Sequence, residues 1–404
     1  MTFSRFDHEC MGEALRLARK GLYSTDPNPR VGCIIADGAT ITGRGWHAAA
    51  GEPHAEIVAL RDAAAHNGEA SRRGHTAYVT LEPCSHHGRT PPCADALAEA
   101  GIARVVFACA DPNPRVNGGG VARLRAAGVA VESGLLAQEA AELNCGFLMR
   151  MRAGRPWVRI KSAISLDGRT ALRNGASQWI SGEASRRDVQ RWRARSSAIL
   201  TGVGTVIADD PSLDARVESG IESGLGEPPV LQPLRVVADS RWRTPPASRV
   251  LDQPERTLLA GLGEREVPAE LRARGARCLP LPVAKEQAES QPEGQVGDRA
   301  GDRAGDRIDL GALLAALAER EINEVQVEAG AQLCGALLRA GLVDELLIYL
   351  APVLLGDGGP GPVALGPLES MDERTHLELL ETTRVGDDLR LRLKPLHKRS
   401  LAGS

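Results

Sequence analysis

Apolar residues along this chain alternate between helical and strand periodicity, and the alternation runs through the sequence twice. In the first round, strands are predicted at residues 31–37, 76–82 and 104–110, and helices at residues 9–22, 54–66 and 93–101. Strands separated by helices are typical of α/β layer structures with a largely parallel sheet. The pattern therefore predicts an α/β fold for this part of the chain.

The alternation stops once and then begins again. A helical run closes at Gly154 and Pro156, and both residue types end helices, so we place a boundary near residue 152. The second round predicts strands at residues 157–165, 198–202, 234–240, 322–330 and 343–356, and helices at residues 182–196 and 331–341. A chain of 404 residues is long enough for two or three cores. We predict two α/β domains, residues 1–152 and 153–404.

One segment of the second half does not fit the alternation. From about residue 283 to 308 the chain is polar and carries a tandem GDRA repeat. Such a segment buries too little apolar area to offset the entropy lost on ordering. We expect a disordered surface insertion.

Charge and apolar patterning exclude several classes of partner. The net charge of −3 leaves no basic excess for a phosphate backbone, so we expect no nucleic acid partner. No apolar run is long enough to cross a bilayer and the N-terminus does not resemble a signal peptide, so we expect no membrane association and a cytoplasmic protein. Eight cysteines are too sparse for a disulfide scaffold and favour reduced thiols or metal ligands.

Two segments of the first half carry residues that bind zinc. His54 and Glu56 open a predicted helix, Cys84 follows a predicted strand, and Cys93 opens the next helix. One His and two Cys leave a tetrahedral zinc an open position for water, as catalytic sites require. The alternatives are a closed structural site, with Cys109, His86 or His87 as fourth ligand, and two cysteines that only pack in the core. The order His-x-Glu, Pro-Cys, Cys matches the zinc deaminase pattern and favours a catalytic site.

The spacing of the two cysteines departs from the usual Cys-x-x-Cys. The loop PCSHHGRTPPC resembles that of the bifunctional deaminase/reductase family of riboflavin biosynthesis, as do PNPRVGCII, GEPHAE and DPNPRVNGGG. The second half shows further similar stretches, KSAISLDGRTA, SQWISG, LTGVGTVIADDPSLDAR and VEAGAQLCGALL. The resemblance covers nearly the whole chain. It implies a cytidine-deaminase-like zinc domain followed by a reductase domain similar to dihydrofolate reductase.

For the first half the resemblance implies a pyrimidine deaminase with one Zn²⁺ per chain. His54, Cys84 and Cys93 would hold the metal, and Glu56 would carry protons between water and the departing ammonia. The substrate would be a small phosphorylated pyrimidine, 2,5-diamino-6-ribosylamino-4(3H)-pyrimidinone 5′-phosphate. By their positions in the motifs, the residues that would contact the substrate are Asn28, His47 and Arg89. Asn28, between two prolines, has the alternative role of a turn residue.

For the second half the resemblance implies an NADPH-dependent reductase that forms 5-amino-6-(5-phospho-D-ribitylamino)uracil. A G-x-G-x-x-G motif does not follow the first strand, so a Rossmann domain has little support. Cofactor contacts fall on Ala163, Trp179, Thr205, Asp209, Ser240, Gly330, Ala331, Gln332, Leu333, Cys334, Gly335 and Ala336. Substrate contacts fall on Ser177, Arg193, Leu213, Arg216 and Glu328, with Lys161, Asp209 and Glu328 as candidates for the acid.

The two arginines suit a phosphorylated substrate, because a guanidinium binds phosphate oxygens with two hydrogen bonds. A phosphate also suits the strand-to-helix turn near Gly330, where backbone N–H groups are free, although this glycine has the alternative role of easing the turn. Two other functions compete: a nucleoside or tRNA deaminase with an unrelated second domain, and a structural zinc module that acts as a scaffold. Neither accounts for the motifs of the second half. We expect a homo-oligomer.

Overall fold

The computed structural model describes residues 3–67, 74–85, 92–114, 116–217, 230–284 and 307–396. The chain forms two compact units, which we describe separately. The first comprises Met1–Pro156 with two short later segments, and the second begins at Trp157. The predicted boundary at residue 152 lies within the last helix before this division. Most of the predicted insertion at residues 283–308 lies outside the described residues.

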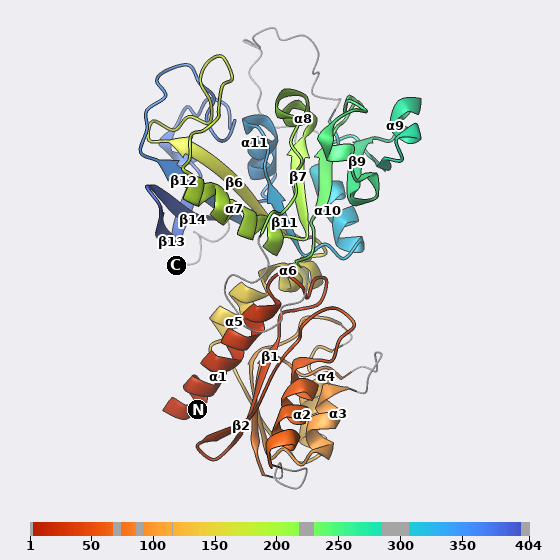
Figure 1. Cartoon of the computed structure of the whole chain (residues 1–404), viewed down its shortest axis with the longest axis vertical. Coiled ribbons are helices and arrows are strands. Elements are labelled where there is room, and N and C mark those ends of the chain that lie inside the picture. The colour runs from red at the N-terminus through yellow and green to blue at the C-terminus, as the bar shows by residue number, and fades with distance from the viewer. Residues whose placement is uncertain are drawn as a thin grey trace. The chain divides into compact units, whose positions relative to one another are not determined.

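The first unit is built on a five-stranded sheet of order β2-β1-β3-β4-β5. Its elements are α1 (Arg5–Ala18), β1 (Gly32–Asp37), β2 (Thr40–Trp46), α2 (Ala55–Asn67), β3 (Thr76–Leu81), α3 (Cys93–Glu99), β4 (Arg104–Cys109), α4 (Gly119–Ala126), β5 (Ala130–Ser133), α5 (Ala137–Leu143) and α6 (Cys145–Ala153). Figure 1 shows β1 beside β2 in this sheet. Strands β3, β4 and β5 are parallel, but β1 runs antiparallel to both of its neighbours. The expectation of a largely parallel sheet is therefore wrong for this edge, because a tight β1–β2 hairpin replaces a helical crossover.

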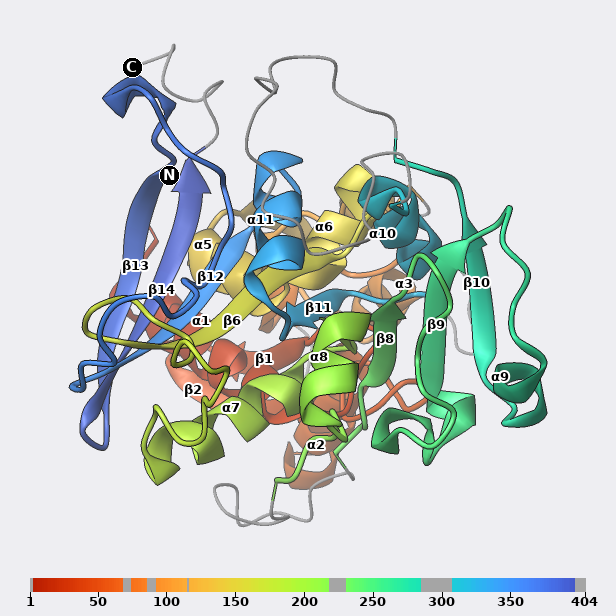
Figure 2. The ribbon, with the colours of Figure 1, turned by 90° about the horizontal axis from the view of Figure 1, so that it is seen from above.

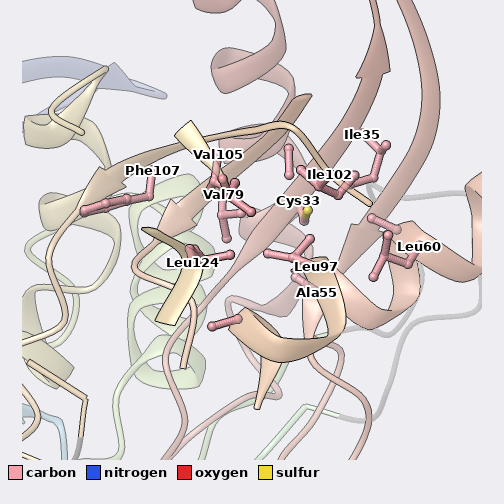
Figure 3. Close-up of a cluster of buried hydrophobic side chains, with 14 of the residues drawn as sticks. Cys33, Ile35, Ala55, Leu60, Val79, Leu97, Ile102, Val105, Phe107 and Leu124 are labelled. Atoms are coloured by element: carbon pink, nitrogen blue, oxygen red, sulfur yellow. The ribbon is translucent and has the colours of Figure 1, made fainter. Parts of the chain in front are cut away.

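Both faces of this sheet are covered by helices. Helices α2, α3 and α4 pack on one face, where Leu60, Leu97 and Leu124 meet apolar residues of β1, β3 and β4 (Figure 3). Helices α1 and α5 cover the other face, where Met11 and Ala140 are fully buried. Burial on both faces explains why the central strands read as continuous apolar runs.

The helix predicted to close the first unit is divided in two by Asn144. Its side chain is 1% exposed and pairs with the backbone of Arg30, accepting from the N–H at 2.8 Å and donating to the carbonyl at 2.9 Å. Helices α5 and α6 lie on either side of this residue. The amide thus fixes the chain that leads into β1.

The second unit is built on a nine-stranded sheet of order β10-β9-β8-β7-β11-β6-β12-β14-β13 (Figure 2). Its strands are β6 (Trp157–Ser165), β7 (Ala198–Gly202), β8 (Leu234–Ala238), β9 (Thr257–Leu262), β10 (Arg277–Leu281), β11 (Glu324–Val327), β12 (Glu345–Ala351), β13 (His376–Val385) and β14 (Asp388–Leu396). Its α-helices are α7 (Glu183–Arg195), α8 (Val203–Asp209), α9 (Ala269–Ala273), α10 (Leu310–Glu319) and α11 (Ala331–Arg339). The strands from β10 to β12 are parallel, as predicted, and the β13–β14 hairpin adds an antiparallel edge.

A layer of charged side chains lies between α7 and this sheet. Arg159 of β6 is fully buried and forms ion pairs with Glu324 at 3.2 Å and Glu345 at 3.1 Å. Both carboxylates also bond a second guanidinium, of Arg195 and Arg392 respectively. The layer continues through Glu381, Arg390 and Asp188, and the ring of Trp192 lies against four of its guanidinium groups. Charged side chains thus fill the space between helix and sheet that apolar side chains usually fill.

Within the described residues, no helix combines the length and the apolar character that spanning a bilayer requires.

Candidate active sites

Three predicted ligands of the first unit converge on one point. The Nδ1 atom of His54 lies 3.2 Å from the Sγ atom of Cys93 and 3.6 Å from that of Cys84. All three ligand atoms lie within 4.8 Å of one another, which is the spacing of donors that share one ion. A donor set of one imidazole and two sulfurs fits tetrahedral zinc and leaves a fourth position open. Cys109 lies outside this group, and His86 and His87 lie outside the described residues.

The ends of three elements hold these side chains in place. His54 precedes the first residue of α2, Cys84 follows the end of β3, and Cys93 is the first residue of α3. The Sγ atom of Cys84 accepts the N–H of Cys93 at 3.3 Å, and its carbonyl accepts the N–H of Ala94 at 3.2 Å. Cys84 therefore caps α3, which provides donors that favour its thiolate form.

The acid/base chemistry of this cluster suits metal binding and proton transfer. A hydrogen bond between the two thiols lowers the pKa of Cys84 to about 4 and raises that of Cys93, so the pair shares one proton before a metal displaces it. The carboxyl group of Glu56 is buried beside them. Burial raises its pKa to about 7, against the opposing charge of His54. A carboxyl group with this pKa can take up and release a proton near neutral pH.

Two predicted substrate contacts lie beside the cluster and bond to each other. The Nδ2 atom of Asn28 lies 3.0 Å from the Nε2 atom of His47, whose Nδ1 atom lies 3.1 Å from the carbonyl of Pro53. Burial lowers the pKa of His47, and its ring meets that of His54 edge to face with centroids 5.5 Å apart. These partners fit a neutral His47 that donates from Nδ1. The third predicted contact, Arg89, lies outside the described residues.

In the second unit the structure joins two residues that were predicted as separate substrate contacts. Arg193 of α7 forms a two-pronged ion pair with Glu328, which follows β11, at 2.7 and 2.8 Å. Gln326 donates to the same carboxylate at 2.8 Å, and Arg193 also donates to the carbonyl of Asp214 at 3.0 Å. Sequence reasoning missed Gln326, although residues 326 and 328 share one face of a strand.

Lys161 of β6 completes this charged cluster. Strands β6 and β11 are paired with Ile160 opposite Val327. Lys161 and Glu328 come next along the two segments and therefore occupy neighbouring positions. Burial lowers the pKa of Lys161. Burial also opposes ionisation of Glu328, but the charge and hydrogen bonds of Arg193, with the charge of Lys161, outweigh it and lower that pKa to about 2. Glu328 is therefore ionised near neutral pH.

The predicted cofactor contacts fall on several elements of the second unit. Ala163 lies on β6, Thr205 and the exposed Asp209 on α8, Ser240 follows β8, and Trp179 is 69% exposed with the guanidinium of Arg186 over its ring. Gly330 is the N-cap of α11, and Ala331, Gln332, Leu333 and Ala336 lie in its first two turns. Cys334 and Gly335 are buried, and a Cβ atom at position 335 would lie 2.1 Å from the carbonyl of Ala364. The first turn of α11 is therefore better placed for a phosphate than its second.

The remaining predicted substrate contacts differ in exposure. Ser177 is half-buried, and Arg216 is exposed with its guanidinium 3.7 Å from Asp214. Leu213 is 2% exposed and has a φ of 50°, in the left-handed region that a leucine rarely adopts. The structure brings Arg193, Glu328 and Lys161 into one cluster, and Leu213 belongs to the neighbouring apolar core.

Comparison with known proteins identifies both halves of the chain. Residues 4–109 match the cytidine and deoxycytidylate deaminase zinc-binding region, and residues 156–391 match the RibD C-terminal domain. The riboflavin biosynthesis protein RibD of Escherichia coli K12 is 45% identical over 392 residues, which cover 96% of this chain and 99% of that protein. RibD of Haemophilus influenzae is 42% identical over 98% of this chain and 99% of its own length.

Solved structures resemble the whole chain as well. RibD of Acinetobacter baumannii, form 1, matches with a TM-score of 0.83 and 43% identity, covering 97% of this chain and 99% of the other. A diaminohydroxyphosphoribosylaminopyrimidine deaminase/5-amino-6-(5-phosphoribosylamino)uracil reductase from Thermotoga maritima matches with a TM-score of 0.78 and 29% identity, with the same coverage. The predicted fold class, with a zinc-binding deaminase domain before an NADPH-dependent reductase domain, is confirmed. The chain belongs to the RibD family and is a bifunctional deaminase and reductase of riboflavin biosynthesis.

Proposed function

We propose that this protein deaminates 2,5-diamino-6-ribosylamino-4(3H)-pyrimidinone 5′-phosphate and then reduces the product to 5-amino-6-(5-phospho-D-ribitylamino)uracil. The observation that carries the first step is the cluster of His54, Cys84 and Cys93 with the buried Glu56 beside it. The donor set fits zinc, and we assign the three residues as its ligands. A zinc ion held there would lower the pKa of the water that attacks the substrate.

Glu56 supports the proton transfers of hydrolytic deamination. It accepts a proton from the attacking water as the new C–O bond forms at the ring carbon that bears the amine. It then delivers a proton to the amine as the C–N bond breaks, so that water is consumed and ammonia leaves. A pKa raised to about 7 by burial makes both transfers feasible near neutral pH. Asn28 and His47 are suitably near the cluster to orient the pyrimidine.

For the second step we assign the reductase site to the cluster of Lys161, Arg193 and Glu328. NADPH bound there would supply the hydride for C1′ of the ribosyl group, whose bond to the ring oxygen would break as that oxygen takes up a proton. We assign Lys161 as the proton donor to that oxygen, because it occupies the β6 position next to Glu328 and burial lowers its pKa. Glu328, with a pKa of about 2, stays ionised and orients Arg193 and Lys161.

We propose a homo-oligomer formed through the second unit, because the edge strand β13 exposes Leu377, Leu379 and Leu380, and an apolar edge favours pairing. We propose that the protein works in the cytoplasm. All eight cysteines lie in the described residues and are free thiols, which suits a reducing compartment.

The proposal is tested on the purified full chain with its zinc content measured. The diaminopyrimidinone ribosyl phosphate is supplied, and ammonia release and NADPH oxidation are followed separately. We expect both signals, with NADPH oxidation dependent on ammonia release. Glu56→Gln should lose ammonia release while it retains zinc, and Glu52→Gln, which changes an exposed carboxylate nearby, should behave like the wild type. Zinc at one equivalent with neither signal would refute the assigned substrate.

A further inference from the structure

The loop that carries Cys84 is held from two sides. On one side Cys84 caps α3 through the N–H groups of Cys93 and Ala94. On the other side lies Glu82, two residues earlier and only 4% exposed. Its carboxylate has no part in the chemistry proposed above, so its burial needs another explanation.

Three backbone N–H groups converge on the carboxylate of Glu82. They belong to Asp111 at 3.4 Å, Gly118 at 3.3 Å and Val121 at 3.4 Å. Gly118 is the N-cap of α4 and Val121 lies in its first turn, where N–H groups have no partner within the helix. The Glu82 side chain therefore satisfies the start of α4 and fastens the Cys84 loop to it, with additional attraction from the helix dipole.

Glycines in the NGGG turn allow this close contact. Gly118 has a φ of 82°, in the left-handed region where glycine carries no steric cost. A Cβ atom at position 120 would lie 2.0 Å from the carbonyl oxygen of Pro83, and backbone cannot yield as a flexible side chain does. The start of α4 and the residues just before Cys84 thus touch backbone to backbone.

We propose that Glu82 is a positioning residue for the metal site, which fixes the sulfur of Cys84 by tying its loop to the first turn of α4. The inference rests on the assignment of Cys84 as a zinc ligand. Groups that hold metal ligands in place typically contribute 10- to 100-fold to metal affinity. Loss of the Glu82 bonds should therefore weaken zinc binding and disturb the ligand geometry, without removing any atom that touches the metal or the substrate.

The test compares Glu82→Gln with the wild type in the full chain. Gln keeps the size of the side chain but replaces one acceptor oxygen by an NH₂ group that faces N–H donors. The zinc Kd is measured by chelator competition, and the thiolate-to-metal absorption bands are recorded after cobalt substitution. We expect a Kd about 10- to 100-fold higher, altered cobalt bands, and a deaminase kcat that falls more than KM changes. Reductase turnover in the same sample reports only that the second unit is folded, so general stability of the first unit is judged from the control variant below.

Glu132→Gln is the matched control. Glu132 is a partly buried carboxylate of β5 that bonds Arg104 at the start of β4, whereas the Cys84 loop lies near the end of that strand. This variant should lose stability but keep the wild-type zinc Kd and cobalt bands. Gly120→Ala, which separates the same loop from α4 by steric contact, should reproduce the Glu82→Gln phenotype.

Three outcomes are decisive. A wild-type zinc Kd and cobalt spectrum in Glu82→Gln would overturn the positioning role. So would an equal loss in Glu132→Gln, because the effect would then be one of general stability. If the wild-type chain itself binds no zinc, the proposed function fails first, and the positioning role falls with it for that distinct reason.

Discussion

Replacing Arg159 by Met should destabilise the second unit far more than any surface charge replacement. The side chain of Arg159 is fully buried between Glu324 and Glu345, which are 0% and 1% exposed. Met fills a similar space but leaves the layer with one more carboxylate than guanidinium groups. Removing one partner of a buried ion pair costs about 3–5 kcal/mol, because the remaining charge stays desolvated. Glu324 still pairs with Arg195, and Glu345 still pairs with Arg392. We therefore expect a loss of stability at the lower end of this range, about 3 kcal/mol.

Hydrogen exchange measures this loss in the full chain. Peptides that cover β6 and β12 report the opening free energy of the second unit, whatever the stability of the first. A loss of about 3 kcal/mol is roughly a hundredfold increase in the opening equilibrium constant, at about 1.4 kcal/mol per factor of ten. Arg187→Met is the control on the same face of the sheet. Arg187 pairs with Glu183 on the surface of α7, with side chains 68% and 74% exposed, so its loss should cost about 0–1 kcal/mol.

The deficit of Arg159→Met should also depend on pH. Burial favours the protonated form of Glu345, but Arg159 and Arg392 outweigh it and lower the pKa to about 2. Without Arg159, burial pushes the folded pKa upward, and a carboxyl group with a raised folded pKa destabilises the protein only while it is ionised. The deficit should therefore shrink as the pH falls from 8 to 5. Equal costs for Arg159→Met and Arg187→Met, or a deficit that grows toward pH 5, would refute the reasoning.

Three further predictions concern activity and assembly. Chelation of zinc should abolish ammonia release but leave reduction of separately supplied deaminated intermediate intact; loss of both activities would contradict the assignment of separate sites. Lys161→Met should slow reduction by about 10²–10⁴-fold with deamination unchanged. Because Lys161 donates its proton only while charged and burial lowers its pKa, wild-type reduction should decline as pH rises through a value below 10.5, and a flat profile up to pH 10.5 would argue against this acid. Leu379→Lys, on the exposed edge strand β13, should reduce the mass measured by light scattering, whereas an unchanged mass would place the interface elsewhere.

Sequence patterns predicted strands best where both faces are buried. Residues 31–37 were predicted as a strand and residues 32–37 form β1, whose first five residues are all buried within the sheet. Strand β2 was missed because Gly43 and Gly45 interrupt its apolar pattern. Those glycines are required by packing, since a Cβ atom at either position would lie 2.2–2.3 Å from a carbonyl oxygen of α2. Tertiary contact with a helix thus overrode local propensity.

The residues of the candidate sites also differ in how far the sequence alone predicts them. His54, Cys84 and Cys93 could be grouped because the identity and order of metal-binding residues carry chemical information by themselves. The pairing of Arg193 with Glu328 could not be predicted, because 135 residues separate them and the sequence offers many other partners for each. Glu82 gave no signal either: its partners are backbone N–H groups, which every residue type except proline provides.

The position of β11 in the second sheet has a consequence for synthesis on the ribosome. This strand lies between β7 and β6 in the sheet, but it follows both of them, as well as β8, β9 and β10, along the chain. The second unit therefore cannot complete its sheet until residues 324–351 have emerged from the ribosome. Until then β6 and β7 each have an unpaired edge. Strands β1 to β5 all lie within residues 32–133 and can pair much earlier. We expect nascent chains that end shortly before residue 324 to hold a folded deaminase unit and an open, chaperone-dependent reductase unit.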